Sequence, residues 1–350
     1  MGIEAFNKLL GLLEPSIAPS SNNKRQDALG AKTVLMMTLR YLAGASYIDI
    51  LRIHGVGRST TFSHIKHCIK AIARHKDIGH QKWPEDKAEC DSYAADWADK
   101  SGPLSLRKLQ QTCIGALDGI LVETYLPTKR ETKRRNDYRS GHKKRIGLNV
   151  QALCDAKLRF LLISILCPGK TNDWSAYGKS VMRNLVEALP EDYYILGDAA
   201  YVNSEHLLAP FPGKGLNGRE DTFNYYQSQL RIRIEMAFAQ LVGRWGVFWR
   251  PLRVPLRDRP TLILATMKLH NFCINEKEAT GLPSYPNGNP APPHVRQGGD
   301  GRFLDQARWH TLFQTQNESD ERVVRDRVAD LMQVLHLQRP AHNLERNANR

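Results

Sequence analysis

Apolar residues in the first third of the chain recur at the spacing of buried helical faces. Leu35, Leu39 and Leu42 follow one another at intervals of four and three, which predicts an amphipathic helix. Similar spacing predicts a short helix over 48–53 and a longer one over 62–72, and a Gly-Val-Gly turn separates them. A helix, a short glycine-containing turn and a second helix form the outline of a helix-turn-helix, which also fits a plain helical bundle with a solvated polar face.

Beyond residue 105 the pattern changes to short alternating or β-branched runs. Strands are predicted for four such runs, each bounded by Gly, Pro or Asp: 114–125, 147–154, 159–165 and 194–196. Two segments, 175–189 and 222–249, have helical character. Because strands that alternate with helices build layered sheets, we expect an α/β domain over 105–277, preceded by a helical domain over 31–104.

The two ends of the chain differ from these domains. Residues 1–30 include a polar, turn-rich stretch and are expected to form a flexible lead-in. Proline and glycine dominate from residue 278, so a linker is expected over 278–316. Apolar residues then return at helical spacing, which predicts an amphipathic helix and a tail over 317–350.

Composition narrows the class of partner. Among 350 residues, 50 Lys and Arg stand against 36 Asp and Glu, which gives a formal net charge of +14. Such an excess favours nucleic acid or an anionic membrane. The longest apolar run is too short to span a membrane, and no basic amphipathic helix is evident. DNA is therefore the expected partner. The lack of a secretory leader and of any C-x-x-C pair favours an intracellular protein.

Half of the excess positive charge lies in one short segment, Thr128–Arg145, which holds nine basic and two acidic side chains. The basic residues are Lys129, Arg130, Lys133, Arg134, Arg135, Arg139, Lys143, Lys144 and Arg145. We expect them to contact DNA phosphates, although a solvated hairpin or a nuclear-import sequence would have the same composition. Lys66 and Lys70, on the predicted helix over 62–72, are also expected to contact DNA.

Three acidic residues lie where a carboxylate needs a partner. Asp118 shares a strand face with apolar residues, so it should be paired, hydrogen-bonded or metal-bound. Asp198 ends a short apolar strand, on the side of a sheet where sites form. Glu235 flanks the apolar stripe of the helix predicted over 222–249. Each has an ordinary explanation too: an arginine partner for Asp118, a turn or N-cap for Asp198, and an ion pair with Arg231 for Glu235.

Together, the three acids offer only oxygen ligands, which Mg²⁺ and Mn²⁺ prefer. Two such ions about 4 Å apart can stabilise the attacking and leaving oxygens of a phosphodiester displacement. Three converging carboxylates would therefore predict metal-dependent cleavage of DNA. A carboxylate pair could instead hydrolyse a sugar, but the basic charge and the third acid argue against that activity.

The sequence around each acid extends this pattern. The motifs are Asp118-Gly119, Gly197-Asp198-Ala199-Ala200-Tyr201 and Arg231-Ile232-Arg233-Ile234-Glu235, and the third acid follows the second by 37 positions. Further motifs follow in order: Gly147–Gln151, Cys154-Asp155, Pro168–Asp173 and Leu269-His270-Asn271. In these respects the chain resembles the PIF/Harbinger-type transposases of the DDE superfamily.

The resemblance implies an RNase H-like catalytic domain that cuts and joins DNA at transposon ends in the nucleus. By position, Asp118, Asp198 and Glu235 would be the catalytic triad and would bind two Mg²⁺ or Mn²⁺ ions. Asp173 stands where the family often has His-Asp, with Asn172 in place of the His, so its role stays open. Implied partners are DNA, a Myb-like DNA-binding protein and a second copy of the chain. The alternative is a transposase-derived DNA-binding or scaffold protein without catalysis.

Overall fold

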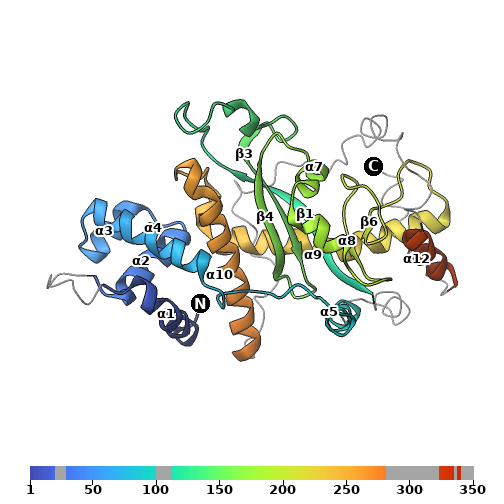
Figure 1. Cartoon of the computed structure of the whole chain (residues 1–350), viewed down its shortest axis with the longest axis horizontal. Coiled ribbons are helices and arrows are strands. Elements are labelled where there is room, and N and C mark those ends of the chain that lie inside the picture. Colours follow the sequence, from blue (N-terminus) through green and yellow to red (C-terminus); the bar gives the residue numbers. More distant parts are fainter. Residues whose placement is uncertain (20–28, 100–111, 281–322, 335–336, 340–350) are drawn as a thin grey trace.

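Helices form the N-terminal part of the chain. The structure is a computed structural model that describes residues 1–19, 29–99, 112–280, 323–334 and 337–339. Its first helices are α1 (Ile3–Ile17), α2 (Ala31–Leu42), α3 (Tyr47–His54), α4 (Arg58–Arg74) and α5 (Lys87–Asp99). Figure 1 shows α1 to α4 gathered on one side of the molecule, separated from the strands by α10 (Arg259–Thr280).

The expected flexible lead-in over 1–30 is wrong for its first half, because α1 is a helix packed into the core. Leu9, Leu13 and Ile17 follow one another at intervals of four and are at most 4% exposed. They face α2 and α4. Burial against other helices stabilises α1. The sequence pattern does not indicate this helix, because the polar, turn-rich stretch that follows it is typical of a flexible segment.

The predicted turn between two helices is confirmed. The Ser46 hydroxyl accepts a hydrogen bond from the Ile48 backbone N–H and so caps α3. Gly55 ends α3 in the left-handed conformation, with φ of 62°, which glycine adopts without steric cost. Helix α4 then begins at Arg58 and packs against α1, α2 and α10. Contact with three neighbours buries Thr61 and Cys68, so only part of α4 faces solvent.

A mixed six-stranded sheet forms the centre of the second part. Its strands are β1 (Cys113–Glu123), β2 (Arg139–Ser140), β3 (Arg145–Cys154), β4 (Phe160–Pro168), β5 (Tyr194–Leu196) and β6 (Leu207–Leu208). The order is β2-β3-β1-β5-β6, and β4 pairs with β3. Strand β1 is antiparallel to β3 and parallel to β5. The four strands predicted from the sequence are therefore confirmed.

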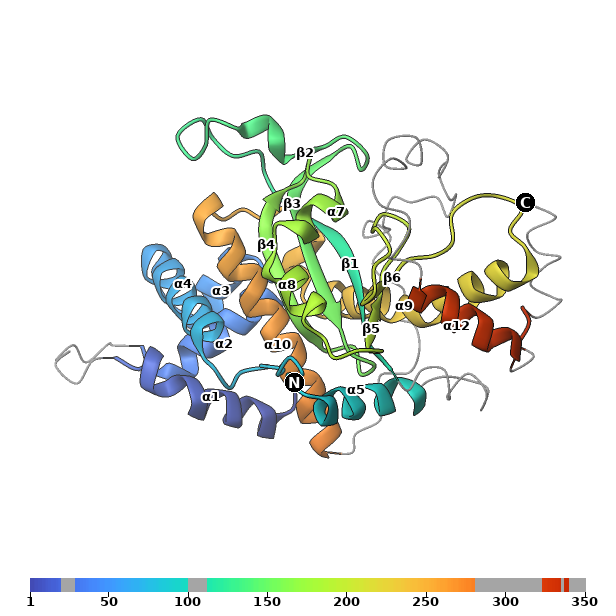
Figure 2. The same cartoon turned by 45° about the vertical axis from the view of Figure 1, so that its right-hand side comes forward.

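Helices cover both faces of this sheet (Figures 1 and 2). Helix α9 (Gly218–Arg244) and α10 pack on one face, and α7 (Asp173–Gly178) and α8 (Val181–Glu187) on the other. The single helix predicted over 175–189 is instead these two helices. The break follows from Ser180, because its hydroxyl and its backbone N–H both donate to the Tyr177 carbonyl and close the first helix.

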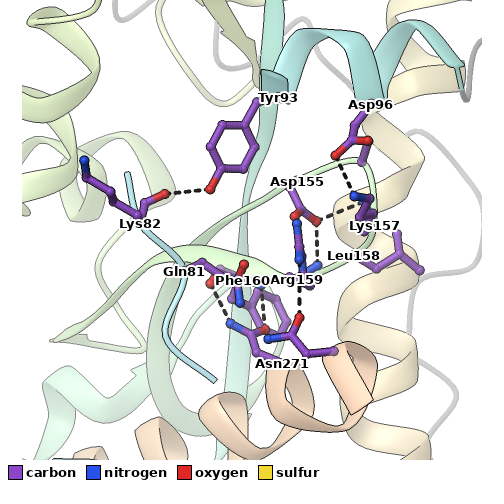
Figure 3. Close-up of polar contacts among 12 residues, drawn as sticks. Gln81, Lys82, Tyr93, Asp96, Asp155, Lys157, Leu158, Arg159, Phe160 and Asn271 are labelled. Carbon is purple, nitrogen blue, oxygen red and sulfur yellow. Dashed lines mark hydrogen bonds and ion pairs between the residues drawn. The ribbon is translucent and has the colours of Figure 1, made fainter. Parts of the chain in front are cut away.

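A buried polar cluster joins the N-terminal region to the sheet (Figure 3). The Asn271 side chain, on α10, donates to the carbonyls of Gly79 and Phe160 and accepts from the Phe160 N–H, at 2.8–2.9 Å. Nearby, Asp155 is fully buried and accepts a hydrogen bond from the Arg159 guanidinium at 2.6 Å. Two of the sequence motifs, Cys154-Asp155 and Leu269-His270-Asn271, thus have a structural role here.

The predicted C-terminal helix is confirmed as α12 (Val323–Val334), which packs against α9. Arg219 on α9 forms ion pairs with Asp326 at 2.9 Å and Asp330 at 2.5 Å on α12. The linker expected over 278–316 lies largely outside the described residues. Within the described part of the chain, none of the helices combines the length and apolar character needed to cross a membrane.

Candidate active site

The register of two parallel strands brings Asp118 and Asp198 to the same level of the sheet. Ala116 on β1 pairs with Leu196 on β5. Asp118 follows Ala116 by two positions within β1, so its carboxylate lies on the same face as Ala116, which packs against α9. Asp198 follows the end of β5, and its electrostatic interactions with Arg231 and Glu235 of α9 show that it lies near the same helix. The strand position predicted for Asp118 and the post-strand position predicted for Asp198 are where the structure has them.

Helix α9 carries Glu235 along this face. Asn217 and Glu220 cap its start reciprocally, each side chain accepting the other residue's backbone N–H. Phe223, Leu230 and Ile234 are among the residues that bury one stripe of the helix. Glu235 lies beside that stripe with a side chain that is 45% exposed, so it is at the solvent edge of the packed surface.

One arginine connects the three predicted acids. The Arg231 guanidinium lies 2.8 Å from a carboxylate oxygen of Glu235 and 3.9 Å from one of Asp118. It also acts electrostatically on Asp198, where it opposes the rise in pKa. The Arg231 side chain is only 18% exposed, so it is an internal counter-ion and not a surface cation.

Burial and crowding of negative charge dominate the electrostatics. Burial, together with the charges of Asp198 and Asp173, raises the pKa of Asp118 to about 7, against the opposing influence of Arg231. Burial also raises the pKa of Asp198, although the Ala200 backbone N–H donates to its carboxylate at 2.9 Å. Negative charge at this edge of the sheet is therefore costly unless a cation accompanies it.

Asp173 belongs to a polar network on the other face of the sheet. One carboxylate oxygen accepts hydrogen bonds from the side-chain amides of Asn149 at 2.9 Å and Gln151 at 2.8 Å. The Tyr201 hydroxyl donates to the Gln151 carbonyl oxygen at 2.5 Å. Gly119 pairs with Gln151 across the strands, and a Cβ atom on it would lie 2.1 Å from the same Asp173 oxygen. Asp173 therefore packs over Gly119, back to back with Asp118.

The ordinary explanations of the three acids all hold in the structure. Asp118 has an arginine nearby, Asp198 makes a turn, and Glu235 pairs with Arg231. Among the residues that the structure describes, no three His, Cys, Asp or Glu side chains are arranged to hold a metal ion. The donor chemistry nevertheless fits Mg²⁺ or Mn²⁺, because the three acids are oxygen ligands and the raised pKa values of Asp118 and Asp198 mean that a nearby cation would favour their ionised forms.

The segment that carries the three acids is similar to a known protein family. A family model described as "DDE superfamily endonuclease" matches residues 117–271. This segment starts one residue before Asp118 and includes Asp198 and Glu235. The chain contains a DDE superfamily endonuclease domain. Its mixed sheet with helices on both faces is consistent with the RNase H-like fold.

The chain is also distantly similar to a named protein. "Protein ALP1-like" from Arabidopsis thaliana is 26% identical over 263 residues, which cover 70% of this chain. The chain spans 61% of the length of that relative. No solved structure is significantly similar to the chain.

The basic arm, Thr128–Arg145, projects from the sheet after β1, includes the short strand β2 and ends at the first residue of β3 (Figure 2). Eight of its nine basic residues are exposed, and Arg135 is half-buried. Arg145 is already paired with Glu123. The Lys170 backbone N–H donates to the Asp137 carbonyl at 2.8 Å, so the arm is anchored to the loop that precedes Asp173.

The two lysines predicted on α4 are on a different element from this arm. Lys66 forms an ion pair with Asp258 at 2.7 Å, and its side chain is 41% exposed. Lys70 is half-buried on the same helix. Both belong to the N-terminal helices. The turn that holds Asp258 also contacts the arm, because the Leu256 backbone N–H donates to the Glu131 carboxylate at 2.8 Å.

The sequence patterns do not predict which side chains surround the acids. The bridge from Arg231 to Asp118 depends on how α9 is placed against β1, which no local pattern reveals. Asn149, Gln151 and Tyr201 were visible as motif residues, but nothing in their spacing indicated that they meet at Asp173. Polar residues that alternate along a predicted buried strand, as in the β3 segment Asn149-Val150-Gln151, were the available signal.

Proposed function

We propose that this protein is a divalent-metal-dependent DNA endonuclease and transposase that cuts and joins phosphodiester bonds at transposon ends. The observation that carries the proposal is the register of β1 and β5, because it sets Asp118 and Asp198 side by side on the face that packs against the Glu235 helix. These acids lie within a DDE superfamily endonuclease domain.

The proposed roles follow from the site's own residues. Asp118, Asp198 and Glu235 would hold one or two Mg²⁺ or Mn²⁺ ions, which supply an activated oxygen nucleophile and stabilise the leaving oxygen. The strands fix the two aspartates, while Glu235, on the solvent-facing side of α9, can adjust its position. Burial beside the sheet weakens the competition of water for the carboxylates.

DNA is the proposed substrate because the basic arm continues from the strand that carries Asp118. Its exposed lysines and arginines offer a series of phosphate contacts close to the loop before Asp173. We further propose that the protein acts in the nucleus, and that a Myb-like DNA-binding protein and a second copy of the chain assist recognition of the transposon ends.

The deciding experiment is DNA cleavage by the full chain and by Asp198→Ala. The substrates are supercoiled plasmid and duplexes that carry the terminal repeats flanking the coding sequence, with Mg²⁺, Mn²⁺ or EDTA. We expect metal-dependent nicking and strand transfer by the wild type, and loss of both in the variant. Glu187→Ala, an exposed acid on α8, is the matched control and should retain activity. Equal activity of Asp198→Ala and the wild type would refute the assigned site.

A second candidate is a DNA-binding protein without catalysis. The pairing of Glu235 with Arg231 favours it, because a carboxylate engaged in that pair is not free to bind a metal ion. In this case the wild type and Asp198→Ala would bind DNA equally and neither would cleave it with any metal.

A further inference from the structure

Arg231 occupies the centre of the acid cluster. Its guanidinium contacts Glu235 at 2.8 Å, lies 3.9 Å from Asp118, and influences Asp198 electrostatically. Both contacts are made by the same terminal nitrogen, Nη1, so one guanidinium charge lies between the two carboxylates. The Arg231 guanidinium therefore already places a positive charge beside the three acids that are proposed to bind a metal ion.

The surrounding structure keeps this side chain in place. Arg231 extends from the flank of α9, next to Leu230 and Ile234, whose side chains are at most 7% exposed. Glu235 lies one helical turn further on, the spacing at which side chains of opposite charge meet on a helix. Asp118 is fixed from the other side by its strand and by the Gly119 backbone N–H, which donates to it at 2.7 Å.

We infer that Arg231 is a built-in competitor of the metal ion: it neutralises Asp118 and Glu235, and it must release Glu235 before the site takes a divalent cation. The inference rests on the proposed function, because it concerns loading of the same acids. Arg231 is a positioning residue in this role. It sets the metal concentration at which the site fills, since the guanidinium and the metal ion compete for the same oxygens.

The physical consequence has a definite sign. Removal of the guanidinium takes away one positive charge that repels a divalent cation. It also leaves two carboxylates without their ion-pair partner, so the affinity for the metal ion should rise. If Arg231 instead held Glu235 in a metal-binding orientation, its removal would lower affinity. The two roles therefore predict opposite changes in the same measurement.

The test measures Mn²⁺ binding to the full chain without DNA, by titration calorimetry and by the electron paramagnetic resonance signal of free Mn²⁺. Arg231→Gln should bind Mn²⁺ on the order of tenfold more tightly than the wild type, from loss of a close unit charge. Lys170→Gln is the matched control. It removes an exposed cation from the loop before Asp173 without touching the acids, and it should match the wild type. Unchanged or weaker binding by Arg231→Gln overturns the inference.

A second measurement uses the wild-type protein and does not depend on the folding of a neutral variant. The side-chain Nε–Hε resonance of Arg231, assigned by its absence in Arg231→Lys, should shift when Mg²⁺ saturates the site. A resonance that stays in place while Mg²⁺ binds would show that the pair does not open, and would overturn the inference.

Failure of the inference is separable from failure of the proposed function. If Asp198→Asn loses Mn²⁺ binding while Arg231→Gln behaves as the wild type, the metal site stands and only the role of Arg231 is removed. If Asp198→Asn binds Mn²⁺ as the wild type does, the assigned metal site is wrong, and the role of Arg231 falls with it.

Discussion

Asp118→Asn should make the protein more stable at neutral and alkaline pH while removing a catalytic acid. Asparagine has the shape of aspartate and can still accept the hydrogen bond from the Gly119 N–H. It cannot ionise, so it avoids the cost of burying a charge, which the nearby charges of Asp198 and Asp173 increase. The substitution therefore tests the energetic cost of the Asp118 charge without changing the packing of the site.

The size of the effect follows from the pKa of Asp118, which is raised to about 7 in the folded protein. A carboxyl with a pKa of about 3.9 in the unfolded chain loses on the order of 4 kcal/mol of folding stability at pH 8 and about 2 kcal/mol at pH 5.5. Because the pKa is raised in the folded protein, the contribution of Asp118 to folding stability is fully present below about pH 4 and is lost as the pH rises through 7.

The assay is urea unfolding of the full chain in EDTA, followed by circular dichroism at pH 5.5 and pH 8. Asp118→Asn should raise the free energy of unfolding at both pH values, and by more at pH 8. Glu187→Gln, an exposed acid with a side chain that is 50% exposed, should change little at either pH. An equal gain at the two pH values, or none at pH 8, would refute the argument from buried charge.

Three other changes test the packing and the DNA surface. Gly119→Ala should lower both the melting temperature and the Mn²⁺ affinity, because a Cβ atom would clash with the Asp173 carboxylate; wild-type values for both would contradict the described packing. Asn271→Ala should cost roughly 3 kcal/mol or more in urea unfolding, since three buried backbone groups lose their partners. Asn275→Ala, which loses one bond of 3.3 Å, is its control and should cost less. In a filter-binding salt titration, Arg130→Ala should lower the slope for DNA binding by about one, and Lys66→Ala by less because of its existing ion pair.

Local sequence patterns determined the elements that carry the acids. Alternation predicted β1 with Asp118 on an inward row, and the short apolar run before Gly197 predicted β5 with Asp198 at its end. The stripe from Ile234 to Leu241 predicted the helix that holds Glu235. These features were readable because the spacing of apolar residues reflects one element facing a core, and that information is contained within each segment.

Only the tertiary structure decided what each face meets. The parallel pairing of β1 with β5 placed Asp118 beside Asp198, and the packing of α9 on that face brought Arg231 to both Asp118 and Glu235. It also placed Asp173 over Gly119, on the opposite face from Asp118. Spacing along a strand or helix states which residues share a face but not which distant side chain fills the space above it. Contacts such as these depend on register and packing between segments, so they are fixed only when the whole chain has folded.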